Sequence, residues 1–456
     1  MLDARRFVAM LMLLLGACAS QQQPDLVRLY APVASKPKAH PLIVIPGVMG
    51  SRLHRIDNDR EVWPGSFWNL MIASDFDDLA LTVPGSEAIA GAPHPAKLGS
   101  GGIFHEIAGE DFYAQIVKTL GDAGGYTCVP REKVTPDSDC VLFAWDWREG
   151  MVVAARELDE LVERLRRLRG DPSLKVDIVA HSAGGLVTRY FVRFGGVDTL
   201  HEVEPTITFA GGQKVRQAIL IATPNYGSIK ALQKAITGYR IGLTRIRPET
   251  IATMPGMFQL LPHPDRTWMI DIQGRRLDLD LNDVATWRRH RWSIWDPEVR
   301  ERIRADFADP SLAEDYLALF EAHFERQLVR AARFHRSLSR PVAAAPTQYV
   351  VFGSACLPTP ARCLLEEVDG RSRVRLHPQD IKHPVAGVPY ERLMIEPGDG
   401  SVTKASLLAM DSLDPGATRG DFPVAWAAFV CERHEKLPAN VTFQDNLLNT
   451  LLYGVN

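Results

Sequence analysis

The feature that most constrains the fold is a short motif centred on Ser182. Residues 175–180 form an apolar run typical of a buried strand, and residues 183–194 have the pattern of a helix. Ala180 and Gly184 occupy the two small positions of the G-x-S-x-G pattern, with alanine in place of the first glycine. A serine in a sharp turn between a strand and a helix is the signature of a nucleophile elbow. We therefore expect Ser182 to be a nucleophile; the alternative is a serine that only caps an ordinary helix.

The pattern around this motif repeats along the chain. Further strands are predicted by short apolar runs, and a helix is predicted by an apolar stripe at residues 157–169. The additional strands are expected at residues 41–46, 141–145, 215–222 and 348–352. Strands that alternate with helices predict an α/β fold with a mostly parallel sheet flanked by helices.

One long segment breaks this alternation. Residues 225–346 carry helical patterns and are expected to form a cap or lid inserted into the fold. The core is then divided into a first part at residues 39–224 and a second part at residues 347–456. Within the cap, an arginine-rich stretch joins Trp287 to Trp292, and Trp295 follows shortly after. This stretch fits a lipid interface, or equally helices that pack on their own domain.

A serine hydroxyl needs a base, usually a histidine oriented by a carboxylate. In the fold predicted here the chain order is serine, then aspartate or glutamate, then histidine. Asp399 lies in a Gly-Asp-Gly turn, and His434 precedes a final helix expected at residues 443–453. His377 and His383 come before Asp399 and are in the wrong order. Taken alone, Asp399 could be a turn residue and His434 a surface residue, but their order behind Ser182 predicts a triad.

Acyl transfer also develops negative charge on the carbonyl oxygen, which backbone N–H groups can stabilise by ~3–4 kcal/mol each. One donor is expected to be the N–H of Ala183, directly after the nucleophile. The other is expected in the turn after the first strand, at Val48, where Gly47 and Gly50 allow the backbone to approach the substrate. A plain strand-to-loop turn is the alternative.

The N-terminus differs from the rest of the chain. Arg5 and Arg6 precede an apolar run at residues 7–15, and small residues lead to Cys18. This pattern predicts an export signal at residues 1–18, because the apolar run is shorter than the ~20 residues of a membrane-spanning helix. The last four residues also resemble a bacterial lipobox, whose cleavage leaves a lipidated cysteine; the alternative is a plain secretory signal with a chance cysteine.

We expect residues 19–38 to be a tether, and the protein to be lipid-anchored in a bacterial cell envelope. Ala19 after Cys18 favours the outer over the inner membrane. A secreted or periplasmic protein is the alternative. The net charge of −3 gives no support for a nucleic-acid partner, which usually needs a clearly basic face.

Export favours disulfides among the five cysteines that remain. The close pairs Cys128–Cys140 and Cys356–Cys363 are the expected bridges, which would leave Cys431 free. No CxxC or HExxH spacing occurs, so neither a metal site nor a cofactor is expected.

The motifs together resemble the lecithin:cholesterol acyltransferase family, which includes lysosomal phospholipase A2 and phospholipid:diacylglycerol acyltransferases. They run in family order from about residue 41 to 440. The matching segments are residues 41–47 with 50–51, 146–148, 180–185, 223–228, 352–360 and 398–401, followed by His434.

The resemblance implies an α/β-hydrolase fold with a cap and lid and a triad of Ser182, Asp399 and His434. It implies an acyl-enzyme formed from a phospholipid or similar lipid ester, whose acyl group passes to water or an alcohol. Family members that act on lipoproteins have a disulfide-closed lid, whereas residues 61–78 here contain no cysteine. Trp63 and Trp68 in this stretch fit an interfacial lid or ordinary packing.

Three other activities stay open from the sequence. An esterase of soluble or polymeric esters would use the same triad. A non-catalytic surface protein would keep only the hydrolase fold, which an intact set of serine, aspartate and histidine argues against. An amidase or thioesterase fits as well, because the triad does not choose the leaving group.

Overall fold

The computed structural model describes residues 23–65, 76–104, 106–107, 110–111, 113–241, 243–342, 344–410 and 423–454. The expected signal at residues 1–18, with Cys18, lies outside the described residues, and so does Trp68. In the described part of the chain, no helix combines the length and the apolar character that crossing a membrane would need.

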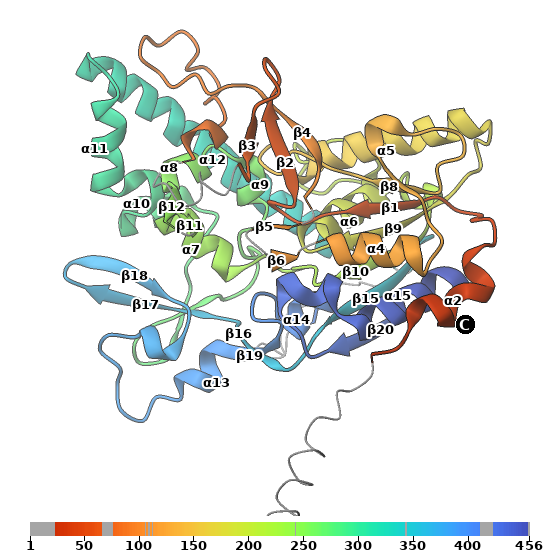
Figure 1. Ribbon diagram of the computed structural model, residues 1–456. Helices are drawn as coiled ribbons and strands as arrows, with labels where there is room; N and C mark the ends of the chain where they lie inside the picture. Colours follow the sequence, from red (N-terminus) through yellow and green to blue (C-terminus); the bar gives the residue numbers. More distant parts are fainter. Residues whose placement is uncertain are drawn as a thin grey trace, which may run out of the picture.

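A seven-stranded sheet forms the centre of the molecule (Figure 1). Its order is β20-β15-β10-β9-β1-β8-β7, and every neighbouring pair is parallel. The strands are β1 (Leu42–Ile45), β7 (Cys128–Pro130), β8 (Cys140–Leu142), β9 (Val176–His181), β10 (Val215–Ile221), β15 (Gln348–Ser354) and β20 (Val424–Val430). Together with the helices on its faces, this sheet confirms the α/β-hydrolase fold expected from the sequence.

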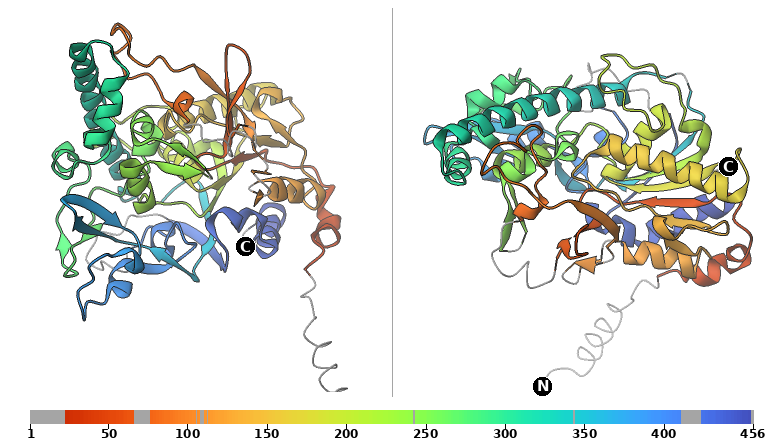
Figure 2. Two further views of the ribbon diagram at one scale, coloured as in Figure 1. Left: turned by 60° about the vertical axis from the view of Figure 1, so that its left-hand side comes forward. Right: turned by 90° about the horizontal axis from the view of Figure 1, so that it is seen from above.

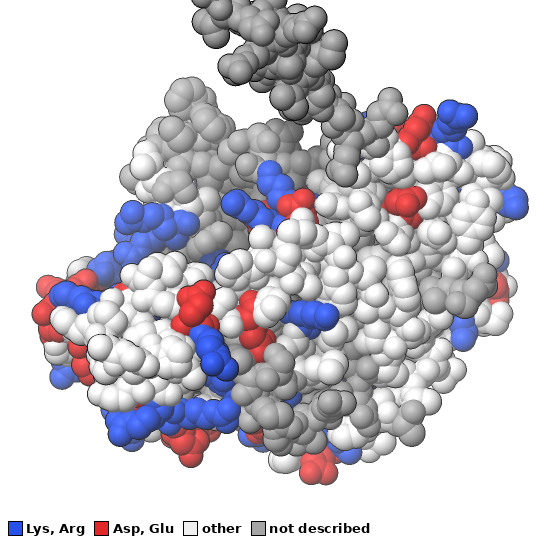
Figure 3. All heavy atoms as spheres, turned by 90° about the horizontal axis from the view of Figure 1, so that it is seen from below, with Lys and Arg blue, Asp and Glu red and all other residues white. Residues whose placement is uncertain are grey.

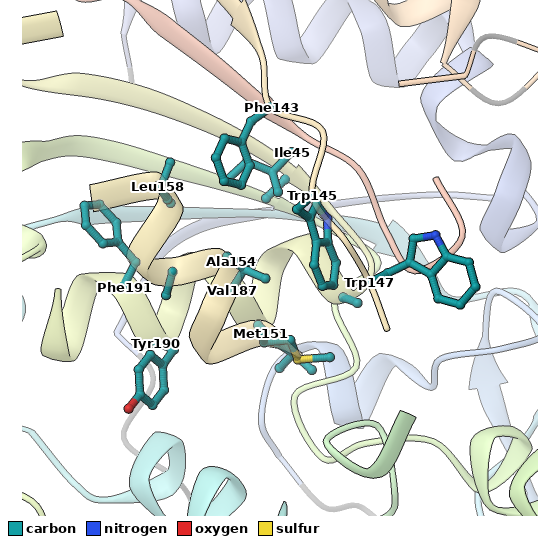
Figure 4. Packing of buried hydrophobic residues seen from close by; sticks show 14 of the residues in the cluster. Ile45, Phe143, Trp145, Trp147, Met151, Ala154, Leu158, Val187, Tyr190 and Phe191 are labelled. Carbon is teal, nitrogen blue, oxygen red and sulfur yellow. The ribbon is translucent and has the colours of Figure 1, made fainter. Parts of the chain in front are cut away.

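Both faces of the sheet are covered by helices, because alternate strand residues point to opposite sides. On one face, apolar strand residues pack against α5 (Met151–Arg169) and α6 (Ala183–Phe194). On the other they pack against α4 (Ala114–Asp122) and α15 (Val441–Tyr453). Figure 2 shows the two layers from further directions. Figure 4 shows the first layer from close by, where side chains of α5 and α6 and the indole of Trp145 fill the space beside the strands.

Part of the expected tether belongs to the folded body. Residues Leu26–Ala34 form helix α2, which packs on α15 through Leu26, Tyr30 and Val33. The Tyr30 hydroxyl donates to Asp445 on that helix at 2.8 Å. The prediction of a tether over residues 19–38 is therefore wrong for this helix, because its apolar face is buried rather than left in solvent.

Between β10 and β15 the chain is mostly helical, as expected for a cap. The helices are α7 (Ile229–Thr237), α8 (Pro248–Ile251), α9 (Pro255–Phe258), α10 (Val284–His290), α11 (Pro297–Ala305) and α12 (Pro310–Ser339). Their shared apolar core also includes Val83, Ala92, Cys363 and Leu376, which lie outside residues 225–346. Neighbouring segments thus contribute to the same layer.

The three cap tryptophans are buried. Trp287 is 0 %, Trp292 2 % and Trp295 8 % exposed, and all three belong to the cap core. Trp63 is buried as well, and its indole N–H donates to the carbonyl of Met49 at 2.9 Å. These four indoles pack inside the protein, so they are not presented to a lipid interface.

Smaller elements surround the two cores. Short antiparallel strands are β2 (Ser51–Arg55), β3 (Glu61–Trp63), β4 (Leu98–Ile103), β5 (Glu106–Ile107), β6 (Glu110–Asp111), β11 (Tyr239–Ile241), β12 (Thr244–Ile246), β14 (Arg276–Leu277), β16 (Leu357–Pro360), β18 (Arg371–Arg375) and β19 (Ile395–Gly398). Strand β17 (Cys363–Val368) pairs with β18 in antiparallel and with β13 (Met269–Ile270) in parallel orientation. The remaining short helices are α13 (Tyr390–Met394) and α14 (Lys404–Leu407).

The structure contains two disulfides, Cys128–Cys140 and Cys356–Cys431. The expected pairing of Cys356 with Cys363 is wrong, and Cys363 is a buried free thiol instead. The sheet explains this difference. Ser354 and Val430 are register partners at the ends of β15 and β20, so the residues that follow them come together. Strand β17 instead places Cys363 in the cap core.

Candidate functional site

Ser182 lies in the sharp turn between β9 and α6. Its backbone has φ 52° and ψ −124°, a left-handed conformation that is strained for a residue with a side chain, by about 1–3 kcal/mol. The turn is held in place because the Ser182 N–H donates to the carbonyl of Ile221 at 2.8 Å. The strain is local and directs the serine out of the strand, as the elbow motif predicted.

Glycines around the turn are required by close packing. A Cβ atom at Gly184 would lie 2.7 Å from the carbonyl oxygen of Pro46, and one at Gly185 would overlap the Thr223 side chain. A Cβ at Gly47 would lie 2.9 Å from the Cβ of Ser182. These contacts bring the turn after β1 directly against the serine, since β1 and β9 are neighbours in the sheet.

The structure brings together the three residues expected to form a triad. The Nε2 atom of His434 lies 3.0 Å from Ser182 Oγ, and its Nδ1 atom lies 2.8 Å from Asp399 Oδ2. With Nδ1–H donated to the carboxylate, Nε2 is left as the acceptor for the serine hydroxyl. The loops are also tied together, because the His434 N–H donates to the Asp399 carbonyl at 3.0 Å.

The Asp399 carboxylate is 3 % exposed, yet it is held in its charged form. Burial alone would raise its pKa, but the His434 imidazole and the N–H groups of Val402 and Ser401 outweigh burial and lower the pKa below its ordinary value. These N–H groups donate to Asp399 Oδ1 at 2.6 and 2.8 Å. One oxygen thus accepts from the backbone while the other accepts from the histidine.

A second hydrogen-bond chain, which sequence reasoning missed, runs behind the triad. The Gly47 N–H donates to the Tyr113 hydroxyl at 2.8 Å, and this hydroxyl lies 2.8 Å from His181 Nδ1. His181 Nε2 in turn lies 3.2 Å from the carbonyl of His434. Because that carbonyl only accepts, His181 carries its proton on Nε2 and accepts from Tyr113 on Nδ1.

This chain is buried and neutral. Burial is the main cause that lowers the pKa of His181 to about 3, and the nearby His434 adds to it. Burial likewise raises the pKa of Tyr113 above its ordinary value. The chain therefore links the turn at Gly47, the strand before Ser182 and the loop of His434 without adding charge. His181 could have been suspected beside Ser182, whereas no sequence signal singles out Tyr113.

The two residues expected to supply oxyanion donors are Ala183, directly after Ser182, and Val48, directly after Gly47, which packs against Ser182. Ala183 is the first residue of α6, so its N–H has no acceptor within the helix. Val48 follows Gly47 in a turn that is closed by the Gly50 N–H donating to the Gly47 carbonyl at 3.0 Å. Since the Gly47 N–H is used by Tyr113, the Val48 N–H is the next donor along this turn.

Helix α7 carries two lysines, Lys230 and Lys234, and the first of them contacts the loop of Asp399. Lys230 Nζ donates to Ser401 Oγ at 3.2 Å, in the loop that holds Asp399. Burial lowers the pKa of Lys230, and it lowers the pKa of Lys234, one turn later, to about 8. Lys234 lies 3.7 Å from the centre of the Tyr239 ring.

In the chain as far as the structure describes it, no group of three or more His, Cys, Asp and Glu could hold a metal ion.

Comparison with known proteins finds one family by sequence and one solved structure of similar fold. Residues 105–296 match the model of the family described as lecithin:cholesterol acyltransferase. The matched segment contains Ser182, the Asp146–Arg148 segment and the segment at residues 223–228. Among curated proteins, none matches the chain by sequence.

One solved structure is similar in fold, and two others match with lower scores. The structure titled "The crystal structure of Tle4-Tli4 complex" is 15 % identical, with a TM-score of 0.52 over 91 % of this chain and 98 % of the other. EstA from Clostridium botulinum is 12 % identical, with a TM-score of 0.34 over 91 % of this chain and 88 % of the other. Lipase 1 from Pelosinus fermentans is also 12 % identical, with a TM-score of 0.34 over 91 % and 99 %. At 15 % identity, the likeness to the Tle4-Tli4 structure concerns the fold alone.

The family match supports a lipid ester hydrolase or acyltransferase as the general class of activity. It also confirms the resemblance that the motifs predicted, because it covers the nucleophile elbow and the segments on both sides of it. In sequence, residues 105–296 of this chain are similar to the lecithin:cholesterol acyltransferase family.

Proposed function

We propose that this protein is a serine-dependent lipid acyl hydrolase or O-acyltransferase that works through an acyl-enzyme. The observation that carries the proposal is the unbroken hydrogen-bond chain from Ser182 Oγ through His434 to Asp399, with distances of 3.0 and 2.8 Å. These distances are within the range that a general base needs to take a proton from its nucleophile.

In the first half-reaction, Ser182 Oγ attacks the carbonyl carbon of a lipid ester while His434 Nε2 takes the hydroxyl proton. Asp399 stays ionised and stabilises the imidazolium, which agrees with its lowered pKa. The N–H groups of Ala183 and Val48 donate to the developing oxyanion. When the tetrahedral intermediate collapses, His434 returns the proton to the leaving alkoxide and the acyl group stays on Ser182.

In the second half-reaction, water or an alcohol attacks the acyl-enzyme and gives its proton to His434, which returns it to Ser182 Oγ as the acyl–Oγ bond breaks. Water yields a free fatty acid, and an alcohol yields a new ester. Which of the two dominates depends on how well the closed site excludes water.

The test uses the purified protein with phosphatidylcholine vesicles, with and without a long-chain alcohol. Free fatty acid, lysolipid and new ester are quantified for the wild type, for Ser182→Ala and for the control Ser173→Ala. Ser173 is an exposed serine whose hydroxyl donates to Asp171, so its loss removes a serine hydroxyl away from the site. We expect acyl release in the wild type and the control, and none above background in Ser182→Ala.

Two other results would contradict the proposal. Turnover of a short soluble ester that depends on Ser182, without release from vesicles, would favour an esterase of soluble esters. If the folded protein turns over neither substrate, a non-catalytic surface protein would be favoured.

We also propose that the protein is exported and anchored by lipid at Cys18 in the cell envelope. The basic, apolar and small-residue order of residues 5–18 motivates this proposal. Cys18→Ser should move the protein from the membrane fraction to the soluble fraction after lysis, as measured by immunoblotting. Unchanged membrane association of the variant would contradict it.

A further inference from the structure

A polar groove, separate from the triad, lies between the cap helices and the β17–β18 hairpin. Its volume is about 620 Å³, and none of Ser182, Asp399 and His434 lines it. We call it the arginine groove, because its lining includes Arg245, Arg289, Arg291, Arg302, Arg371 and Arg373. Figure 3 shows lysines and arginines gathered with acidic residues at the left end of the face seen from below, which is the end that the cap helices and this hairpin form in Figure 1.

Some of these arginines are neutralised by carboxylates. Arg371 pairs with Glu298 at 2.8 Å, and Arg302 makes two hydrogen bonds to Glu249 at 2.8 and 3.0 Å. Their charges are thus largely used within the protein. The pKa of Glu298 is lowered, mainly by Arg371 and to a smaller extent by Arg302 and Arg373.

Three exposed arginines keep their charge available. Arg289 and Arg291 lie at the end of α10, and Arg373 lies on β18. Among the residues that the structure describes, no carboxylate comes within 4.0 Å of the guanidinium nitrogens of these three side chains. The acidic groups that also line the groove have other partners: Asp296 accepts from the N–H of Glu298, Glu367 from the Ser372 hydroxyl, and Asp369 pairs with Lys382.

The walls that carry these arginines are fixed to each other. The Trp292 indole N–H donates to the carbonyl of Ser372 at 3.2 Å, and His290 Nδ1 lies 2.9 Å from the Ser372 hydroxyl. Both contacts join the C-terminal end of α10 and the residues just after it to β18. Arg291 and Arg373 are the chain neighbours of the residues that make these contacts. The rings of His290 and Trp292 stack at 4.8 Å. The two walls are therefore joined by these hydrogen bonds as well as by the Arg371–Glu298 pair.

We propose that the arginine groove binds a phosphate-bearing anion. Guanidinium groups donate paired N–H bonds that match phosphate oxygens, and unpaired arginines on two fixed walls can approach one anion from both sides. The volume lies within the range of small-molecule sites. Because the lining is polar and charged, the groove suits a headgroup or a soluble phosphate ester rather than an acyl chain.

The groove is also placed near the triad. Helix α7 has nine residues and is therefore about 13 Å long. Lys230 at its start donates to Ser401 beside Asp399, while Thr237 at its end lines the groove. A lipid headgroup bound in the groove would hold a membrane surface beside the proposed active site. The binding itself does not depend on the proposed catalysis.

The test measures binding of the full chain to two probes that separate the sources of phosphate. One probe is inorganic pyrophosphate, followed by calorimetry. The other is vesicles of phosphatidylcholine with and without phosphatidic acid, followed by co-sedimentation. The double variant Arg289→Gln/Arg373→Gln removes two unpaired charges, and Arg275→Gln/Arg336→Gln removes two exposed arginines that pair with Asp271 and Asp265 outside the groove.

We expect the groove variant to bind at least about tenfold more weakly, and the control variant to bind within about twofold of the wild type. Saturable binding of pyrophosphate would identify soluble phosphate as a ligand, and binding only to vesicles with phosphatidic acid would identify a lipid headgroup. Hydrolysis of a short soluble ester should be equal in all three proteins, which checks folding. The proposal is overturned if the wild type binds neither probe, or if both variants lose affinity equally, since that would indicate general charge attraction.

Discussion

The carboxyl edge of the central sheet and the core of the cap both bury polar side chains, but the polar groups named below differ in their hydrogen bonding. At the sheet edge, Tyr113, His181 and Asp399 are each hydrogen-bonded to the loops that surround Ser182. In the cap core, the Trp295 indole N–H and the Ser293 hydroxyl are buried without a hydrogen-bond partner among the described residues. The polar side chains around Ser182 are therefore fixed by hydrogen bonds, whereas these two cap side chains are held by apolar packing.

The comparison predicts that isosteric changes at the sheet edge abolish activity and leave stability nearly intact. In Asp399→Asn, the side-chain oxygen can still accept from the N–H groups of Ser401 and Val402, but its NH₂ group faces His434 Nδ1. Because an NH₂ group donates, Nδ1 must accept from it, and the imidazole proton then sits on Nε2. His434 can therefore no longer accept the Ser182 proton as a base. We expect kcat for ester hydrolysis to fall by about 10⁴-fold with an unchanged thermal midpoint.

The matched control for this variant is Asp445→Asn. It alters a carboxylate on α15 that accepts a hydrogen bond from Tyr30. Its kcat should equal that of the wild type. A decrease of less than about tenfold in Asp399→Asn would show that the edge is not organised as proposed.

The two disulfides differ in their distance along the chain from His434, which gives a second test. Cys356–Cys431 closes a separation of 75 residues and should contribute about 4 kcal/mol, while Cys128–Cys140 closes 12 residues and should contribute about 3 kcal/mol. Only the first is attached to the catalytic loop, since Cys431 shortly precedes His434. Replacing both cysteines of that bridge by serine should lower both kcat and the urea midpoint. Replacing the other pair should lower the midpoint alone, and equal kcat losses would refute the assignment.

These two regions also differ in how far the sequence predicts them. The strand, sharp turn and helix around Ser182 follow from local periodicity and from small residues at fixed positions. Asp399 and His434 followed from chain order. Tyr113 could not be found in this way, because it approaches Gly47 and His181 only through the folded sheet.

The sequence of the cap is ambiguous for a related reason. Alternating tryptophans and arginines are compatible with a lipid interface and with a packed core, and only the folded position of Trp287 and Trp292 decides between the two. Similarly, close spacing suggested that Cys356 pairs with Cys363. The pairing depends instead on which strands are neighbours, and β20 lies beside β15. Long-range contacts of this kind leave no local pattern.

Tyrosine hydroxyls provide a smaller, matched test of the sheet edge. Tyr113→Phe removes the link between Gly47 and His181, and leaves two buried groups without their partner, which should cost about 1–3 kcal/mol of stability. Tyr190→Phe should cost a similar amount, because its hydroxyl bonds Thr199 at 2.9 Å at the far end of α6.

The two variants should differ in kinetics. Tyr113→Phe loosens the turn that carries the Val48 donor, so we expect kcat to fall by about tenfold with little change in KM. Tyr190→Phe should leave both constants unchanged. If both variants lower kcat equally, Tyr113 acts only through stability.

The last expected effect concerns the stability of the cap core and its dependence on pH. His323 on α12 is 3 % exposed, and burial, assisted by Arg326, lowers its pKa to about 4. Between pH 6.5 and 4 the unfolded chain therefore binds a proton at this position that the folded protein does not. The free energy of unfolding should fall as the pH decreases through this window, by up to about 1.4 kcal/mol per pH unit from this residue. In His323→Gln this contribution is absent, so urea unfolding at pH 6.5 and 4.5 should show a smaller loss of stability than in the wild type. Equal losses would mean that His323 takes up its proton in the folded cap, which would remove the contrast between a packed core and a hydrogen-bonded edge.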